Sequence, residues 1–151
     1  MSGVRIERLG PDDWRRFREV RQGALRTDPR AFASSAHRWL DDEDREPAWR
    51  TRLELVRTVV ASFEGDDVGT AGLSDDGELL AMWVAPRARR VGVGRVLVEA
   101  VLGLAADPSR VHLRVMADNA EGIAFYERCG FVLEGGGPDD EQCLGMRRRS
   151  A

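Results

Sequence analysis

The first third of the chain changes from a strand pattern to helical patterns. Apolar and polar residues alternate over Val4–Leu9, which predicts a half-buried strand. From Pro11 the apolar residues recur every three or four positions up to a break at Asp28-Pro29, so a helix with one buried face is expected there. Two further helices with an acidic loop between them are predicted next: Arg30–Leu40, the loop Asp41–Glu46, and the helix Pro47–Arg57.

The rest of the chain begins with three strand-like segments. Residues 58–64, 68–74 and 78–84 are rich in apolar and β-branched residues, and the turn signals between them are Gly65-Asp66-Asp67 and Asp75-Asp76-Gly77. Helices and strands then alternate: Gly92–Ala106 and Asn119–Cys129 as helices, Val111–Met116, Phe131–Glu134 and Gln142–Arg148 as strands. The first of these helices makes the strands before and after it parallel neighbours, joined by a right-handed crossover. Because no repeat or linker divides the chain, we expect one α/β domain over residues 1–151.

Composition narrows the range of functions. The chain has 151 residues with a formal net charge of −3 and a pI near 5.5, which argues against nucleic acids and anionic membranes as partners. All 23 basic residues are arginine, which excludes a P-loop lysine and lysine Schiff-base chemistry. Cys129 and Cys143 form neither a disulfide framework nor a zinc site, and no metal is expected. The N-terminal residues have no signal-peptide pattern, so a cytoplasmic protein is expected.

A loop rich in arginine and glycine follows the strand predicted over residues 78–84. Glycines let backbone N–H groups approach an anion closely, and a helix that begins near Gly92 offers unpaired N–H donors and the positive end of its dipole. Arginine binds phosphate through paired hydrogen bonds. The loop therefore fits a diphosphate, although a tight strand-to-helix turn with solvated arginines explains the same residues. Leu97 stands where a dinucleotide-binding fingerprint needs its third glycine, and no P-loop sequence is present.

Two motifs at the proper separation resemble the Gcn5-related N-acetyltransferases. Arg89-x-x-Gly92-x-Gly94 matches the (Arg/Gln)-x-x-Gly-x-(Gly/Ala) loop of that family. Downstream, Asn119 and the segment Phe125–Phe131 resemble the family's second motif, an asparagine followed by Tyr-Glu and a Gly-Phe pair. The resemblance covers Glu78–Glu134, while the helical N-terminal third and the last strand fit the order of the fold without diagnostic residues.

The resemblance implies both a fold and a ligand. The fold is a mixed, mostly antiparallel sheet of about seven strands flanked by about four helices, whose two central parallel strands splay apart to admit acetyl-CoA. Loop amides would hold the pyrophosphate, and the backbone of the splayed strand would pair with the pantetheine arm and donate to the acetyl carbonyl. The residues implied to contact acetyl-CoA are Met82, Trp83, Val84, Arg89, Arg90, Val91, Gly92, Val93, Gly94, Arg95, Asn119 and Tyr126.

Two residues are candidates for proton handling. Tyr126, the single tyrosine, matches the family residue that protonates or hydrogen-bonds the departing CoA thiolate; packing against the sheet is the alternative role. A free phenol titrates near 10 and a thiol near 8.5, so full proton transfer is uphill by about 2 kcal/mol, and a hydrogen bond or a lowered phenol pKa is expected instead. Glu78 is the candidate base for the attacking amine, with a solvated glutamate beside a turn as its alternative. Asp75 and Asp76 are explained by the turn.

Two further residues have structural explanations that compete with chemical ones. Asn119 precedes a helix, so it is expected to cap the helix, and the resemblance adds a contact with the cofactor arm. Cys129 lies at a helix C-terminus before Gly130, where the helix dipole disfavours a thiolate. We therefore expect direct attack of the amine in a ternary complex rather than an acetyl-cysteine intermediate.

The expected acceptor is a primary amine, and a small amine, an amino acid, an antibiotic and a protein N-terminus are all open. Two acidic stretches, residues 41–44 and 139–141, either attract a cationic amine or balance the abundant arginine. Trp39 and Trp49 either line an acceptor pocket or belong to the core. Two other functions are kept open, a catalytically silent acyl-CoA-binding module on the same fold and a binder of nucleotide phosphates. Many family members dimerise, so a homodimer is possible, but no sequence feature decides it.

Overall fold

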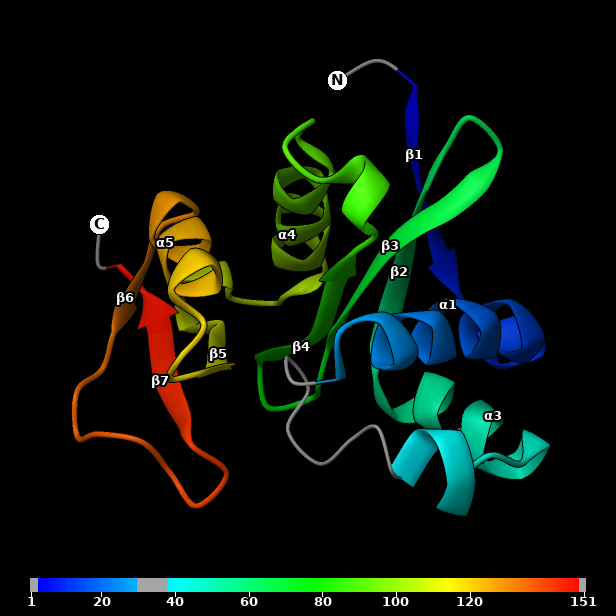
Figure 1. The fold of residues 1–151 in the computed structure, drawn as a ribbon, viewed down its shortest axis with the longest axis horizontal. Coiled ribbons are helices and arrows are strands. Elements are labelled where there is room, and N and C mark those ends of the chain that lie inside the picture. Colours follow the sequence, from blue (N-terminus) through cyan, green and yellow to red (C-terminus); the bar gives the residue numbers. More distant parts are fainter. Residues whose placement is uncertain (1–2, 30–37, 150–151) are drawn as a thin grey trace.

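A seven-stranded sheet organises the chain, with the strand order β1-β2-β3-β4-β5-β7-β6 (Figure 1). The structure is a computed structural model, and it describes residues 3–29 and 38–149. Antiparallel pairing joins all neighbours except β4 and β5, which are parallel. The strands are β1 (Val4–Leu9), β2 (Arg57–Phe63), β3 (Asp66–Leu73), β4 (Glu78–Val84), β5 (His112–Met116), β6 (Phe131–Leu133) and β7 (Cys143–Arg148).

The helices of the described residues lie in the connections between these strands. They are α1 (Trp14–Thr27), α3 (Glu46–Leu55), α4 (Val93–Leu104) and α5 (Ala120–Arg128), with a π-helical turn at Arg38–Asp42 and 3-10 turns at Pro11–Asp13, Pro86–Ala88 and Pro108–Arg110. Within the described ranges, none of these helices is both long and apolar enough to cross a membrane. The mixed, mostly antiparallel sheet with its parallel pair confirms the predicted fold class.

Three local predictions are wrong. Asp41 and Asp42, predicted in a loop, belong to the π-helical turn. The helix predicted to reach Arg57 ends at Leu55, because the backbone of the next residue is already extended for entry into β2. The first hairpin turns at Glu64 and Gly65, whose φ angles are positive, so the two aspartates that follow lie in β3. Most of the helix expected over Arg30–Leu40 lies outside the described residues.

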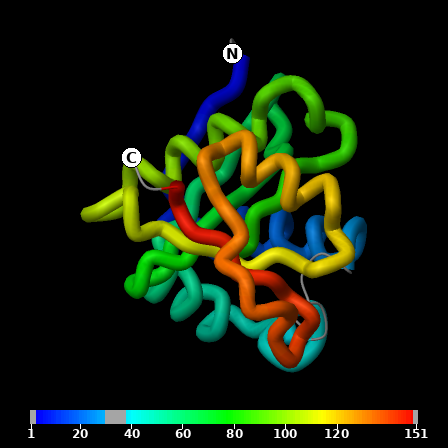
Figure 2. The backbone as a smooth tube through the Cα atoms, turned by 90° about the vertical axis from the view of Figure 1, so that its left-hand side faces the viewer, coloured from blue at the N-terminus to red at the C-terminus, as the bar shows by residue number. Residues whose placement is uncertain are grey.

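The sheet separates two hydrophobic cores, and alternation along β2 shows this directly. Val59 and Ala61 pack into the core beneath α4, whereas Val60 packs into the core beneath α1 and α3. The first core also contains Leu97, Val98 and Val101 of α4 together with Leu79, Leu113, Phe131 and Met146 of the sheet. The C-terminal part, with β5, α5, β6 and β7, lies at one end of the molecule in Figure 1, and Figure 2 views the molecule from that end, so this yellow-to-red part lies in front.

β4 and β5 pair with each other over only two residue pairs. Glu78 pairs with His112 and Leu79 with Leu113, and no further pair follows toward Val84. The register between β4 and its other neighbour, β3, shifts at the same point. The sheet therefore opens on the C-terminal side of Leu79, which is the end of β4 that leads into the arginine- and glycine-rich loop.

Candidate active site

A bulge in β4 marks the start of the opening. Thr70 pairs with Trp83 and Gly72 with Leu80, so Ala81 and Met82 together oppose Ala71 alone. Ala81 has a φ angle of 57°, in the left-handed region that a residue with a Cβ rarely adopts. A bulge bends its strand and increases the local twist. The bulge thus accounts for the divergence of β4 from β5.

The opening leaves one edge of β4 without a strand partner. Trp83 and Val84 pair with β3 on one side, whereas on the side of β5 the pairing has already ended at Leu79. Backbone N–H and C=O groups on such an edge are available to an extended ligand that pairs like an added strand. Met82, Trp83 and Val84, the predicted contacts of the pantetheine arm, lie on this edge.

The start of α4 provides unpaired N–H donors next to this edge. Gly92 is the N-cap residue with a φ angle of 92°, Arg90 has a φ angle of 66°, and no side chain caps the helix. The first-turn amides of Val93, Gly94 and Arg95 have no intrahelical acceptor, because an α-helix supplies none there. The helix dipole adds partial positive charge at the same place. This end of α4 is therefore suited to an anion.

The side chains of the loop and of the start of α4 differ in their exposure. Val93 is buried in the core, whereas Arg90 and Val91 are exposed. Arg95 is exposed, lies 3.9 Å from Glu99 and donates to the carbonyl oxygen of Arg128 at 3.4 Å. Only the backbone of Val93 is thus available to a ligand at this position.

Arg89 joins the loop to two other elements. Its Nε donates to the carbonyl oxygen of Val84 at 2.8 Å, and its Nη2 donates to Asp28 Oδ2 at 2.7 Å. The same carboxylate oxygen accepts from Trp83 Nε1 at 2.8 Å. Asp28 therefore ties the end of α1 to the tip of β4 and to the loop. Sequence reasoning missed this residue, because the Asp-Pro pair was explained fully by a helix break.

At Gly94 the start of α4 packs closely against side chains of α5 and β4. A Cβ at this position would lie 3.0 Å from Phe125 Cζ and 3.5 Å from Met82 Cε. Glycine is thus needed here for close packing between elements, in addition to any close approach of a ligand. The contact places the start of α4 and the second motif, on α5, beside the bulge.

Tyr126 lies on α5 with its ring packed edge-on against Phe125 and Phe131, at centroid distances of 5.2 and 6.0 Å. Burial, and then the nearby Cys129, raise the pKa of Tyr126 above its ordinary value. The direction excludes the lowered phenol pKa that was one expectation from the sequence. No described residue forms a hydrogen bond with the hydroxyl group. Tyr126 is therefore a neutral phenol with its hydroxyl available to another group.

The ends of α5 behave as predicted. Asn119 Oδ1 accepts a hydrogen bond from the backbone N–H of Gly122 at 2.9 Å, which confirms the predicted cap; its contact with a cofactor stays a prediction. Gly130 has a φ angle of 95° just after the helix. Burial raises the pKa of Cys129, so the thiol is not activated as a nucleophile.

Glu78 lies at the closed end of the opening. Its backbone N–H donates to Ser74 Oγ at 3.0 Å, and its Cα partner across the sheet is His112. The bulge begins three residues further along β4, about 10 Å away at the usual rise of a strand. Glu78 therefore lies three residues away from the bulge rather than on it.

The two acidic stretches are largely neutralised by arginine. Asp44 pairs with Arg18 at 2.7 Å, and these contacts, with a hydrogen bond from Trp49, lower its pKa. Arg114 pairs with Asp139 at 2.7 Å and with Glu141 at 3.1 Å. Of the two roles that the sequence left open for these acids, these contacts favour charge balance with arginine over attraction of a cationic amine. Trp39 and Trp49 are buried in the core beneath α1 and α3.

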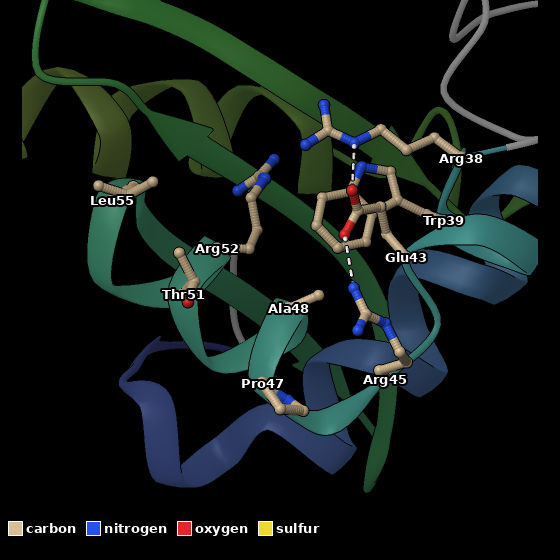
Figure 3. Close-up of a pocket in the computed structure, with 9 residues that line it drawn as sticks. All are labelled: Arg38, Trp39, Glu43, Arg45, Pro47, Ala48, Thr51, Arg52 and Leu55. Atoms are coloured by element: carbon tan, nitrogen blue, oxygen red, sulfur yellow. Dashed lines mark ion pairs between the residues drawn. The ribbon is translucent and has the colours of Figure 1, made fainter.

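A surface cavity of about 330 Å³ lies beside α3 and the π-helical turn (Figure 3). Glu43 sits between Arg38 and Arg45, at 3.9 and 3.8 Å. Burial, and then the charge of Arg38, lower the pKa of Arg52 to about 10. Trp39 lines this cavity, whereas none of the residues predicted to bind acetyl-CoA or to handle protons does, and we assign the cavity no part in the chemistry at β4.

Comparison with known proteins decides the family. Residues 14–131 match the model of the acetyltransferase (GNAT) family, which covers most of the chain. The chain belongs to the GNAT family of acetyltransferases. It is therefore an acyltransferase of the N-acetyltransferase type. This confirms the family resemblance that the sequence shows at Arg89–Gly94 and Asn119–Phe131. No curated protein matches the sequence.

Solved structures of GNAT proteins share the fold. An N-acetyltransferase, PaiA, of Thermoplasma acidophilum in complex with coenzyme A has a TM-score of 0.75 at 18% identity, over 99% of this chain and 100% of that one. A GCN5-related N-acetyltransferase of Rhodopseudomonas palustris has a TM-score of 0.72 at 21% identity, over 100% and 98% of the two chains. Spermidine N-acetyltransferase of Vibrio cholerae, in complex with CoA and spermine, has a TM-score of 0.71 at 18% identity, over 97% and 94%. The likeness over whole chains establishes the fold of this GNAT protein along its length.

Proposed function

We propose that this GNAT protein moves an acetyl group from acetyl-CoA to a primary amine by direct attack of the amine in a ternary complex. One observation carries the proposal: the unpaired edge of β4 and the uncapped start of α4 adjoin each other at the opening of the sheet. An extended, amide-bearing arm fits the first and a diphosphate fits the second. Acetyl-CoA combines both groups in one molecule.

The backbone does most of the binding in this account. The N–H groups of residues 91–95 would hold the pyrophosphate, with Arg90 and Arg95 adding charge from exposed positions. Residues 82–84 would pair with the pantetheine arm along the edge that β5 leaves open. Beside the bulge, their N–H groups would donate to the acetyl carbonyl and stabilise the negative charge that develops on its oxygen. Arg89, already engaged by Val84 and Asp28, would fix the loop in place.

Tyr126 would donate a hydrogen bond to the sulfur of the departing CoA. Because burial raises its pKa, the phenol keeps its proton at neutral pH. Complete transfer of the phenol proton to a thiolate is unfavourable even for ordinary pKa values of about 10 and 8.5. The raised pKa of Tyr126 makes this transfer still less favourable. Stabilisation of the developing thiolate by a hydrogen bond is the role that fits both facts.

Glu78 would accept the proton of the attacking amine through water. A free alkylamine has a pKa of about 10.4, so almost all of it is protonated at neutral pH and must lose a proton before it attacks. Glu78 forms no ion pair with a described arginine, which leaves its carboxylate available. The raised pKa of Cys129 favours this direct route over an acetyl-cysteine.

The acceptor we favour is a small amine. The relative of Vibrio cholerae acts on spermidine, and the net charge of −3 of this chain suits a cationic substrate. A protein amine remains the second choice of acceptor. A catalytically silent acyl-CoA-binding module is the alternative function, and a neutral, unpartnered Tyr126 at the opening favours the enzyme over it.

Release of free CoA thiol from acetyl-CoA, measured over a panel of amines, tests the proposal. We expect release to depend on the amine, and Tyr126→Phe to lower kcat about 100-fold, in the range found for positioned proton donors. Phe keeps the ring contacts with Phe125 and Phe131, so acetyl-CoA affinity measured in parallel should change little. Thiol release that ignores the amine, or a Tyr126→Phe variant with unchanged turnover at every pH, would contradict direct catalysis with this residue.

A further inference from the structure

Three side chains with metal-binding chemistry meet at the closed end of the opening. They are Asp76 in the turn before β4, Glu78 at the start of β4, and His112 at the start of β5. One carboxylate oxygen of each acid and one ring nitrogen of the histidine all lie within 4.8 Å of one another. Asp76 and His112 are 36 positions apart in the chain, and no metal-site spacing connects the three residues. This is why no metal is expected from the sequence.

The backbone around the three residues is held by several hydrogen bonds. Glu78 and His112 are direct partners across the parallel pair, and the N–H of His112 donates to the carbonyl oxygen of Gly77 at 3.1 Å. The N–H of Ser74 donates to the carbonyl oxygen of Glu78 at 2.9 Å. Gly77 has a φ angle of 90°, a conformation that glycine adopts without strain. The side chains therefore project from a rigid frame, as a preformed ligand set requires.

The basic group beside the two carboxylates is His112. Many acids of this arginine-rich chain form ion pairs, yet no ion pair joins a described arginine to Asp76 or Glu78. Asp76 accepts a hydrogen bond from Ser74 Oγ. His112 Nδ1 lies 3.4 Å from the carbonyl oxygen of Arg110, a backbone group of the kind that orients metal-binding histidines.

We propose that Asp76, Glu78 and His112 bind a divalent transition-metal ion, with Zn²⁺ as the best match. Two carboxylate oxygens and one imidazole nitrogen are a ligand set that zinc accepts at about 2.0–2.2 Å, with water in a fourth position. Mg²⁺ and Ca²⁺ prefer oxygen ligands alone, so the nitrogen of His112 selects against them.

Occupation of the site has a consequence that rests on the proposed function. A metal ion bound to Glu78 takes the lone pairs with which that carboxylate would accept the proton of the amine. Zinc would then inhibit acetyl transfer without competing with acetyl-CoA, whose predicted contacts lie at the other end of β4. The ion would inhibit the base and would take no part in the reaction itself.

Titration of the tag-free protein with ZnCl₂ against a chromogenic chelator tests the binding directly. We expect one saturable site, at least 10-fold weaker in His112→Gln and in Glu78→Gln, and no competition from millimolar Mg²⁺. Asp75→Asn, one residue from the cluster, and Cys129→Ser are the matched controls and should bind zinc like the unaltered protein. Unfolding midpoints without metal establish that the variants are folded.

Two results would overturn the metal site. One is the absence of saturable binding, and the other is equal affinity in the cluster variants and in the controls. Thiol release measured with and without zinc separates this proposal from the function on which its consequence rests. Saturable binding with undiminished acetyl transfer would keep the metal site and remove Glu78 as the base.

Discussion

At the scale of single residues, proton handling is divided between two environments. Tyr126 is packed between Phe125 and Phe131, and burial keeps it protonated. Glu78 lies near the other end of β4, beside His112 and without an arginine partner among the described residues. A protonated phenol can donate a hydrogen bond to the leaving thiolate. A carboxylate without an arginine partner can accept a proton from the incoming ammonium group.

The pH dependence of the Glu78→Gln variant tests this division. The neutral fraction of an alkylamine falls about tenfold for each pH unit below its pKa, so the need for a base grows as the pH falls. We expect kcat/KM of Glu78→Gln to be lowered most near pH 6 and to approach that of the unaltered enzyme above pH 9. A matched control is Glu99→Gln, on the exposed surface of α4. A parallel pH profile for Glu78→Gln and the unaltered enzyme would remove Glu78 as the base.

Residues with a local role were easier to predict than residues with a distant partner. The cap by Asn119 and the left-handed Gly130 follow from their positions at the ends of a helix, and both are confirmed. The link from Asp28 to Trp83 and Arg89 spans 55 and 61 positions of sequence, and no periodic pattern records it. The shift in the pKa of Tyr126 depends in the same way on neighbours from β6 and α5 that the sequence does not place.

At the scale of elements, the connection from β4 to α4 concentrates the unusual backbone of the site. Ala81, Arg90 and Gly92 all have positive φ angles within twelve residues of one another. Such conformations persist only where the surroundings enforce them, and they gather at functional sites. The bulge opens the edge of β4, and the left-handed residues turn the chain so that the first amides of α4 face outward without a cap.

Substitution of Gly92 tests the role of this connection. Alanine is strained at a φ angle of 92°, so the loop must shift and the amide donors lose their positions. We expect Gly92→Ala to weaken acetyl-CoA binding at least 10-fold by calorimetry. Gly103→Ala is the control within the same helix, because a Cβ there meets no atom within 4 Å, and it should leave the affinity unchanged. Equal affinities in the two variants would contradict anion binding at the start of α4.

The boundaries of elements show what hydrophobic periodicity can and cannot predict. Alternation located β1, which matches its predicted bounds, and apolar, β-branched content located the central strands, because the sheet has a core against each face. The acidic residues Asp41 and Asp42 were predicted as loop, yet they continue a helical turn whose Trp39 is buried. Tertiary burial of one aromatic residue thus outweighs the local preference of its polar neighbours.

At the scale of the whole molecule, the sheet consists of two parts that meet at two residue pairs. One part contains β1 to β4 with α1, α3 and α4, and the other contains β5 to β7 with α5 (Figure 1). The helix between β4 and β5 predicts that these strands are parallel neighbours, but the pattern of residues does not predict that they separate. That expectation came only from the family resemblance, because a splay depends on the register at the bulge rather than on composition.

Thermal unfolding with and without acetyl-CoA tests the central claim, that this opening holds acetyl-CoA. At a ligand concentration 100 times Kd, binding adds about 2.7 kcal/mol to the free energy of unfolding, which is a rise of about 5–10 °C in midpoint for a domain of this size. We expect that rise with acetyl-CoA, and none with ATP or NAD at the same concentration. An unchanged midpoint with acetyl-CoA, or an equal rise with ATP or NAD, would contradict the claim.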